Sequence, residues 1–301
     1  MEEEIRKLIH ERGPLTGSEL LDTLDHDPLL LWRACNSSKN LAIRRAGTRY
    51  LRLDRRVPGF ARLSPSILRE FLTYSAVGHP ENPALLEKKV LSIAAKIEEV
   101  SRAKSTLLYR IVSSLGTQLE SEISLDERVC FMLGGDIVYN MAHDVSRPER
   151  STGRLVKGSD MDMVVIVEDR FPRNLTMKLD DAIYQEKYRL LTTPHLREEI
   201  DYIVKDMNRV REQARFDTFK HMVACKILYE GTLLHGSEHL FHQVKTLLRQ
   251  RGVVQKIQAM EEAAKAFRRE AVHYLLSKDP DHIKEERLYL FYPTEESEEF
   301  E

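Results

Sequence analysis

The stretches Phe131-Met132-Leu133-Gly134-Gly135-Asp136 and Lys157-Gly158-Ser159-Asp160-Met161-Asp162-Met163-Val164-Val165-Ile166-Val167 decide the fold of this chain. The first is an apolar run that ends in two glycines, which predicts a buried strand followed by a tight turn into a helix. Such a turn lets backbone N–H groups and a helix N-terminus face a phosphate. Because Gly134 and Gly135 carry no side chains, we expect the backbone there to approach phosphate oxygens closely.

The second stretch predicts a strand that begins with two acids and continues as an apolar run. Since strand side chains alternate between faces, Asp160 and Asp162 are predicted to point to the same side, about 7 Å apart. Two carboxylates at this spacing beside a glycine turn suit divalent metal ions that also bind a triphosphate. An Asp-x-Asp pair alone is often just two solvated acids, but here it accompanies a Gly-Gly turn, a Lys-Gly-Ser run and an apolar strand.

The Gly-Gly turn, the spacer after it and Asp160-Met161-Asp162 together resemble the signature of the nucleotidyltransferase superfamily, of which DNA polymerase beta is the best-known member. The resemblance covers roughly the middle third of the chain. It implies an enzyme in which a hydroxyl attacks the α-phosphate of ATP or another NTP and releases pyrophosphate. It also implies Mg²⁺ (or Mn²⁺) ions held by three carboxylates, of which Asp160 and Asp162 match the first two.

The third carboxylate of that superfamily normally lies on a neighbouring strand, between apolar residues. Asp201 fits this description best, with Glu199 and Asp206 as alternatives. The resemblance therefore implies Asp160, Asp162 and Asp201 as catalytic metal ligands. By the same resemblance the nucleotide is expected to contact these residues: Gly134, Gly135, Lys157, Ser159 and Lys220.

Two features depart from the superfamily pattern. The residue after the glycines is often Ser or Thr in relatives, but here it is Asp136, an acid that would repel phosphate unless it turns away or binds metal. The spacer of 24 residues (136–159) is about twice the usual length and includes Ser151-Thr152-Gly153-Arg154. We expect its hydroxyls and its basic residues, Arg147 among them, to contact the triphosphate or the acceptor. The alternative is a degenerate, non-catalytic site.

Residues 1–78 predict three short helices followed by two alternating strands around Ala46-Gly47. Thr16-Gly17-Ser18-Glu19 has the form of a capping box, which marks the start of the second helix. This order of three helices and a β-hairpin is similar to a winged helix-turn-helix domain.

The predicted hairpin is strongly basic. Between Arg33 and Arg62 the sequence has nine basic residues and one acid, Asp54, a local charge of +8 in a chain whose net charge is −2. A basic patch in a near-neutral protein is typical of phosphate contact, so we expect the arginines of residues 44–56 to bind nucleic acid. The alternative is a solvated hairpin that pairs with acidic surface elsewhere in the chain.

The rest of the sequence is mostly helical, including a long pattern from residue 84 that is expected to break near residues 101–105. The expected fold class is α+β. The expected parts are a winged-helix-like domain (1–78), a helical connector (79–124), a polymerase-beta-type nucleotidyltransferase domain with a small mixed sheet (125–235), a C-terminal helical bundle (236–284) and an acidic, disordered tail (285–301).

Composition narrows the class of protein. Of its residues, 42% are hydrophobic and 31% are charged. This hydrophobic fraction is large enough to form ordinary protein cores. Its cysteines are Cys35, Cys130 and Cys225, scattered and odd in number, which favours a reducing compartment over a disulfide framework. The acidic start of the sequence does not predict a signal peptide, and no apolar stretch approaches membrane-spanning length. We therefore expect a cytoplasmic protein without a membrane partner.

The function expected from these patterns is transfer of a nucleoside monophosphate from an NTP to a hydroxyl. The basic segment favours a nucleic-acid acceptor. A protein acceptor, as in toxin-type relatives, and a small molecule are the next alternatives. A different class of function is a non-catalytic DNA-binding regulator that senses nucleotides.

Overall fold

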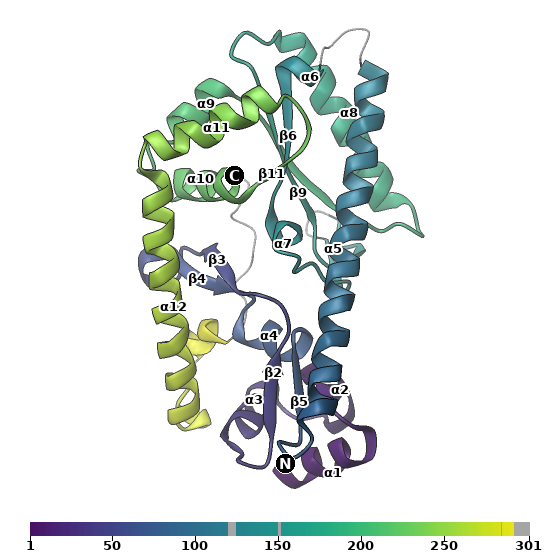
Figure 1. The fold of residues 1–301 in the computed structure, drawn as a ribbon, viewed down its shortest axis with the longest axis vertical. Coiled ribbons are helices and arrows are strands. Elements are labelled where there is room, and N and C mark those ends of the chain that lie inside the picture. The colour runs from purple at the N-terminus through teal and green to yellow at the C-terminus, as the bar shows by residue number, and fades with distance from the viewer. Residues whose placement is uncertain (120–124, 150–151, 284, 292–301) are drawn as a thin grey trace. The chain divides into compact units, whose positions relative to one another are not determined.

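The computed structural model of the chain describes residues 1–119, 125–149, 152–283 and 285–291. These residues form two compact units (Figure 1). The first contains Met1–Ile97 and the described residues from Ala259 onward, and the second contains Glu98–Gln258. Helices and small sheets occur in both, which confirms the expected α+β class.

The first unit is built from short helices, 3₁₀ segments and short strands. Its helices are α1 (Glu2–Arg12), α2 (Gly17–Leu24), α3 (Pro28–Ser37) and α4 (Ile67–Thr73), with short 3₁₀ segments η1 (Pro58–Phe60), η2 (Pro280–His282) and η3 (Glu285–Leu290). Its strands are β1 (Leu15–Thr16), β2 (Ala42–Arg45), β3 (Tyr50–Leu53), β4 (Ala61–Ser64) and β5 (Ser75–Gly78). Two longer helices, α5 (Pro83–Leu119) and α12 (Val253–Ser277), contribute to both units.

The start of α2 forms as the sequence predicts. The Thr16 hydroxyl accepts from the Glu19 backbone N–H at 3.2 Å, and the Glu19 carboxylate accepts from the Thr16 N–H at 2.7 Å. Two of the N–H groups that a helix start leaves without partners are thereby satisfied, which confirms the capping box.

The predicted hairpin of residues 41–53 is wrong. Strand β2 pairs with β5, in a sheet of order β1-β5-β2, whereas β3 pairs with β4 in a separate two-stranded sheet. The alternating patterns indicated strands correctly but not their partners, because pairing depends on strands that lie beyond residue 60. The basic residues 44–56 are consequently distributed over two sheets.

The C-terminal segment also differs from expectation. Residues 285–290 form η3, and Phe291 is fully buried, with its ring centroid 5.5 Å from that of Trp32. The apolar residues Leu288, Leu290 and Phe291 offset the acids that indicated a disordered tail from residue 285. The remainder of that predicted tail, from residue 292, lies outside the described residues.

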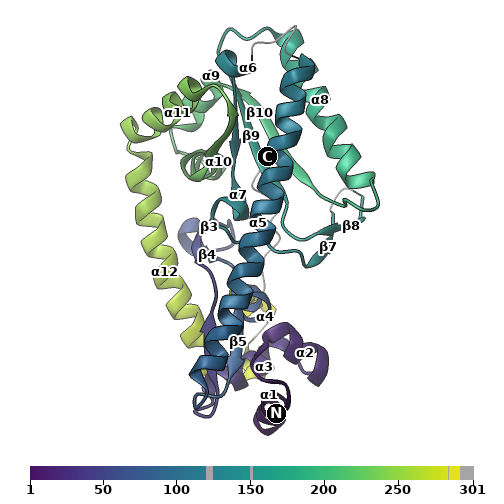
Figure 2. The same cartoon turned by 45° about the vertical axis from the view of Figure 1, so that its right-hand side comes forward.

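The second unit is built on a four-stranded mixed sheet. Its strands are β6 (Val129–Leu133), β9 (Met161–Val167), β10 (Ile200–Asp206) and β11 (Thr232–Gly236), in the order β10-β9-β6-β11, and β7 (Ser146–Pro148) pairs with β8 (Leu155–Lys157). Its helices are α6 (Leu125–Arg128), α7 (Gly135–Val138), α8 (Arg173–Thr192), α9 (Met207–Gln213), α10 (Phe219–Glu230) and α11 (Glu238–Gln250). The β7–β8 hairpin, visible in Figure 2, occupies the long spacer before β9.

The core of this unit lies where the sheet packs against α8 and the C-terminal part of α5. Fully buried residues there include Leu108, Phe131, Met163, Val165 and Leu179. The central strand β9 is buried along its whole length, and its neighbour β10 runs parallel to it. This explains the uninterrupted apolar run of the sequence, because a strand covered on both faces needs apolar residues at every position.

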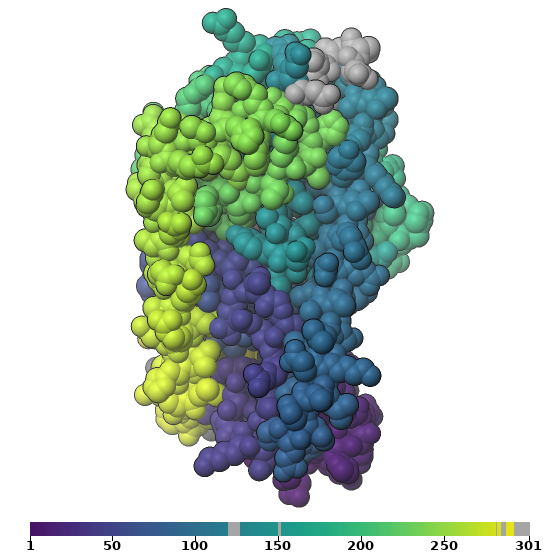
Figure 3. Space-filling view, in the orientation of Figure 1, coloured from purple at the N-terminus to yellow at the C-terminus, as the bar shows by residue number. Residues whose placement is uncertain are grey.

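Helix α5 is a single helix of 37 residues, without the break expected near residues 101–105. Part of its side remains at the surface of the second unit (Figure 3), where Tyr109 is 50% exposed. The predicted C-terminal helical region, residues 236–284, contributes α11 to the second unit and the greater part of α12 to the first. Among the described helices, none combines the length and apolarity needed to cross a bilayer.

Candidate functional site

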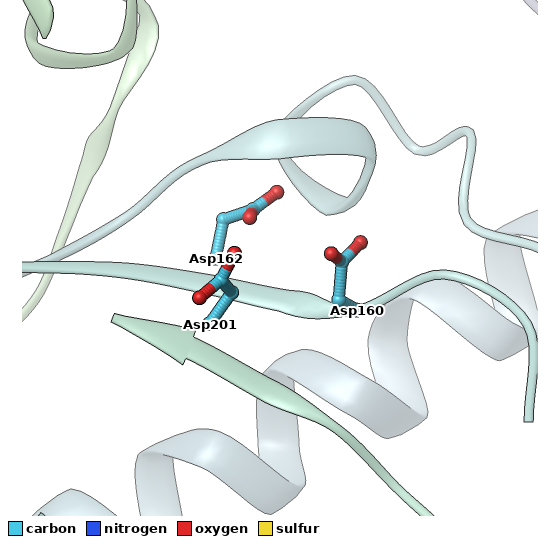
Figure 4. A group of neighbouring side chains, drawn as sticks. All are labelled: Asp160, Asp162 and Asp201. Atoms are coloured by element: carbon cyan, nitrogen blue, oxygen red, sulfur yellow. The ribbon is translucent and has the colours of Figure 1, made fainter. Parts of the chain in front are cut away.

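Three carboxylates converge where β9 and β10 begin (Figure 4). Asp160 precedes β9, Asp162 is its second residue, and Asp201 is the second residue of β10. One oxygen from each of these three side chains lies within 4.8 Å of the other two. We call this group the carboxylate cluster.

Strand pairing creates the cluster. Asp201 is the register partner of Asp162 in the parallel β9–β10 pair, so their side chains stand next to each other on the same face. Between the two acids of β9, Met161 points to the opposite face and is fully buried. Asp162 is only 7% exposed, whereas Asp160 and Asp201 remain partly accessible. A deep carboxylate with two accessible neighbours leaves a path for a ligand from solvent.

The glycine turn after β6 packs directly on Asp162. The Gly134 N–H donates to the Asp162 carbonyl at 2.9 Å. Gly135 has a φ of +68°, and a Cβ there would lie 1.7 Å from Asp162 Oδ2. Glycine is therefore required at 135 for two reasons, the left-handed backbone and the room for the carboxylate. From the sequence we expected these glycines to let the backbone approach phosphate oxygens. The neighbour that the structure shows beside Gly135 is the Asp162 carboxylate.

The helix predicted after the turn forms, and it is short. Helix α7 spans four residues, Gly135–Val138. The Asp136 carbonyl accepts from both the Tyr139 and Met141 N–H groups, and Asn140 adopts a left-handed φ of 53°. These bonds close the helix after one turn.

The side chains of Asp136 and Ser159 are hydrogen-bonded to each other. The Ser159 hydroxyl donates to Asp136 Oδ2 at 3.0 Å and accepts from the His143 N–H at 3.2 Å. Ser159 is buried, so its hydroxyl serves inside the protein rather than as an exposed nucleotide contact. The acid that departs from the superfamily pattern is thus held by a hydrogen bond within the turn.

Arg147, from β7, is a cation beside the cluster. Its Nη2 lies 2.8 Å from Glu199 Oε2 and 3.6 Å from Asp160 Oδ2. Its Nε donates to the Gly158 carbonyl at 2.8 Å, which fixes the guanidinium plane. Burial raises the pKa of the Glu199 carboxyl above its usual value, and the charge of Arg147 opposes that rise.

Two lysines approach the same region. Lys187 Nζ on α8 lies 3.9 Å from Asp201 Oδ1. Lys104, buried on α5, donates to the Lys157 carbonyl at 2.7 Å and to the Glu198 carboxylate. Lys104 thereby ties together the chain segments that lead into Asp160 and into Asp201.

The other residues predicted for the site lie as follows. Lys157 is exposed and its Nζ donates to the His195 carbonyl at 2.9 Å, and Lys220 is exposed in the first turn of α10. Of the alternative third carboxylates, Glu199 binds Arg147 and Asp206 caps α9 by accepting from the Arg209 N–H at 2.7 Å. Asp201 is the one whose oxygen joins those of Asp160 and Asp162.

The donor set fits a small divalent cation. All three groups supply carboxylate oxygens, the ligands that Mg²⁺ and Mn²⁺ prefer, and three acids at this separation repel one another unless a cation neutralises them. Asp160, Asp162 and Asp201 would hold such an ion.

Sequence reasoning gave Arg147 only a general role and missed Lys104. The long spacer was the available signal for Arg147, because surplus chain beside a motif often carries function. Lys104 gave no signal, because a lysine in a long helix usually points to solvent.

A second cationic group lies in the first unit. Arg49 binds Glu70 through Nε at 2.6 Å and Nη2 at 2.5 Å, and Arg45 and Arg268 approach the same carboxylate at 3.9 and 3.4 Å. Arg62 Nε donates to Asp54 at 3.0 Å. We call Arg45, Arg49, Arg62 and Arg268 the arginine cluster. In these ion pairs the four guanidinium groups contact two carboxylates, Glu70 and Asp54.

No family model, curated protein or solved structure matches the chain.

Proposed function

We propose that this chain is a metal-dependent nucleotidyltransferase that moves a nucleoside monophosphate from ATP or another NTP to a hydroxyl. The observation that carries the proposal is the carboxylate cluster packed against the Gly134-Gly135 turn. The order β10-β9-β6-β11, with the turn after β6 beside the first acids of β9, is consistent with a polymerase-beta-type domain.

The chemistry assigns a role to each part of the site. Bound Mg²⁺ would lower the pKa of the acceptor hydroxyl and neutralise the departing pyrophosphate. Asp162, buried and held by the turn, would keep the cation in a fixed place, and the more accessible Asp160 and Asp201 would adjust to substrate. The Gly134-Gly135 turn maintains this arrangement by leaving room for Asp162.

Nucleic acid is the acceptor class that we favour. The exposed arginines of the basic segment support it through their positive charge, namely Arg44, Arg45, Arg49, Arg55 and Arg56. The chain order α1-β1-α2-α3-β2-β5 with sheet order β1-β5-β2 is also consistent with a winged helix-turn-helix in which residues 46–74 are inserted between the last two strands. Because Glu70 and Asp54 already neutralise part of the cluster, a protein hydroxyl is the second candidate acceptor.

The test is transfer of label from each α-labelled NTP with Mg²⁺ to total cellular RNA, DNA or protein. Incorporation into RNA or DNA supports the full proposal, and incorporation into protein supports the transferase with the second acceptor. If no NTP yields incorporation or pyrophosphate, the chain is not a nucleotidyltransferase. Nucleotide binding without turnover would then favour the non-catalytic regulator.

A further inference from the structure

The β7–β8 hairpin brings a positive charge to a site made of acids. The contacts of Arg147 include Glu199, Asp160 and the Gly158 carbonyl. Of these, the contact with Asp160 is the longest, at 3.6 Å. The guanidinium therefore has a firm anchor on Glu199 and Gly158 and a looser contact with a cluster member.

Asp160 cannot interact fully with a divalent cation and with Arg147 at the same time without placing two positive charges side by side. Like charges at such distances repel, so the ion and the guanidinium compete for the Asp160 carboxylate. A group with more negative charge than the cluster alone is needed to hold both. A triphosphate supplies it, because its oxygens accept from a guanidinium fork as well as from a metal ion.

The hydroxyl-bearing residues near the turn do not offer the same contact. Asp136 occupies the position that carries Ser or Thr in relatives, and the Ser159 hydroxyl is buried against it. Arg147 is partly exposed and lies beside the accessible side of the cluster. It is thus a cation placed to meet a polyphosphate there, as is Lys187 on the side of Asp201.

We infer that Arg147 is an exchangeable counter-ion of the carboxylate cluster, which neutralises Asp160 and Glu199 in the free protein and binds the triphosphate when metal and nucleotide enter. The inference rests on the proposed function and assigns a substrate-binding residue to the same site. Because Arg147 belongs to β7, the β7–β8 hairpin is then part of the nucleotide site.

The inference predicts opposite effects on two ligands. In Arg147→Ala the competitor for Asp160 is gone, so the affinity for Mn²⁺ alone should rise about threefold, the size expected for a partly exposed ion pair. The affinity for inorganic triphosphate at saturating Mn²⁺ should fall about tenfold, since a charge-assisted contact is lost. Arg147→Lys keeps the charge without the fork and should lie between parent and Arg147→Ala for both ligands.

The measurement is titration of full-length protein with Mn²⁺ followed by spin resonance, and with inorganic triphosphate followed by calorimetry. Arg209→Ala removes a matched arginine from an exposed ion pair with Glu212 on α9 and should change neither affinity. A merely structural role for Arg147 would lower both affinities together. That result, or an unchanged value for either ligand in Arg147→Ala, would overturn the inference.

Failure of the inference and of the proposed function give different results. If the parent protein transfers nucleotide but Arg147→Ala binds both ligands as the parent does, only the role of Arg147 is wrong. If the two opposite shifts appear but the parent transfers no nucleotide to any acceptor, the role inferred for Arg147 is correct and the proposed transferase activity is wrong.

Discussion

Asp162 is the residue on which the geometry of the site depends. Its carbonyl accepts from Gly134, its carboxylate fills the space that a Cβ at 135 would need, and its strand partner is Asp201. A carboxylate fixed from three sides loses little conformational freedom when it binds a cation, and this favours binding.

Gly135→Ala tests the contact between the turn and Asp162. The new Cβ would lie 1.7 Å from Asp162 Oδ2, so the carboxylate must move. We expect loss of Mn²⁺ binding and destabilisation beyond the roughly 1 kcal/mol that a left-handed alanine costs. Titration with Mn²⁺ and urea unfolding measure both effects.

Gly153→Ala is the matched control, because Gly153 has nearly the same φ, +67°, but nothing lies within 4 Å of the position that a Cβ would occupy there. It should cost about 1 kcal/mol and leave Mn²⁺ binding unchanged. Equal Mn²⁺ affinities in both variants would show that Asp162 does not depend on the turn.

At the scale of elements, α5 supports the site although it contributes none of the three acids. Lys104 holds the end of β8 and the segment before β10, and the Ser101 hydroxyl accepts from the Ala142 N–H at 3.1 Å. The segments that lead into Asp160 and into β10, which carries Asp201, are thus fastened to a long helix.

Lys104→Met should therefore destabilise the protein by about 2–3 kcal/mol, because it leaves the Glu198 carboxylate without its cation. Urea unfolding measures this. Adding Glu198→Leu should recover part of the loss, since the two side chains interact directly. Arg110→Met, on an exposed position of the same helix, serves as control. A double variant as unstable as the sum of the two single variants would contradict the pairing.

The sequence predicted some elements better than others for physical reasons. The strand at 161–167 and the capping box at Thr16 depend on neighbouring residues and could be predicted. The pairing of β2 with β5 could not, because the paired residues are 30 to 36 positions apart and the intervening chain forms β3 and β4. The burial of Phe291 was not predicted, because the acids on either side of this apolar run indicated a disordered tail.

At the scale of the whole molecule, the first unit is assembled from both ends of the chain. Its core joins Ile5, Leu20 and Trp32 to Leu275 and Phe291. Deleting residues 1–78 would expose the apolar side of α12 and the C-terminal segment, so loss of nucleic-acid binding in such a truncation would have two explanations. Point variants give a clearer result.

Variants of two arginines, Arg44 and Arg62, distinguish a contact with phosphate from an ion pair within the protein. Arg44 is exposed on β2, whereas Arg62 is buried and bound to Asp54. If the segment binds nucleic acid, Arg44→Ala should flatten the log–log salt dependence of binding by about 0.7–0.9, the value for one phosphate contact. Arg62→Ala should lower stability and leave that slope unchanged. The same slope in Arg44→Ala and parent, over a salt titration, would remove Arg44 from the interface.

The pH dependence of stability has a predicted sign. Burial lowers the pKa of Lys205 on β10 to about 8, below the value of about 10.5 expected in the unfolded chain. The unfolded state therefore binds more protons between these values, so the contribution of Lys205 to stability rises with pH, by about 2 kcal/mol from pH 7.5 to 9.5. Urea unfolding at both pH values should show this rise in the parent and its loss in Lys205→Met. A parent and a variant with the same pH profile would contradict the assignment.

The central claim is that Asp160, Asp162 and Asp201 together hold the cation required for nucleotidyl transfer, and the most direct test is the cation binding and transfer activity of the three Asp→Asn variants. Each replacement keeps the shape of the side chain and removes a charge. We expect transfer from labelled NTP to fall to background in all three, Mn²⁺ affinity to fall with it, and far-ultraviolet circular dichroism to remain that of the parent. Asp181→Asn, an exposed acid on α8, should keep both properties. Transfer at the parental rate by any of the three variants would contradict the account.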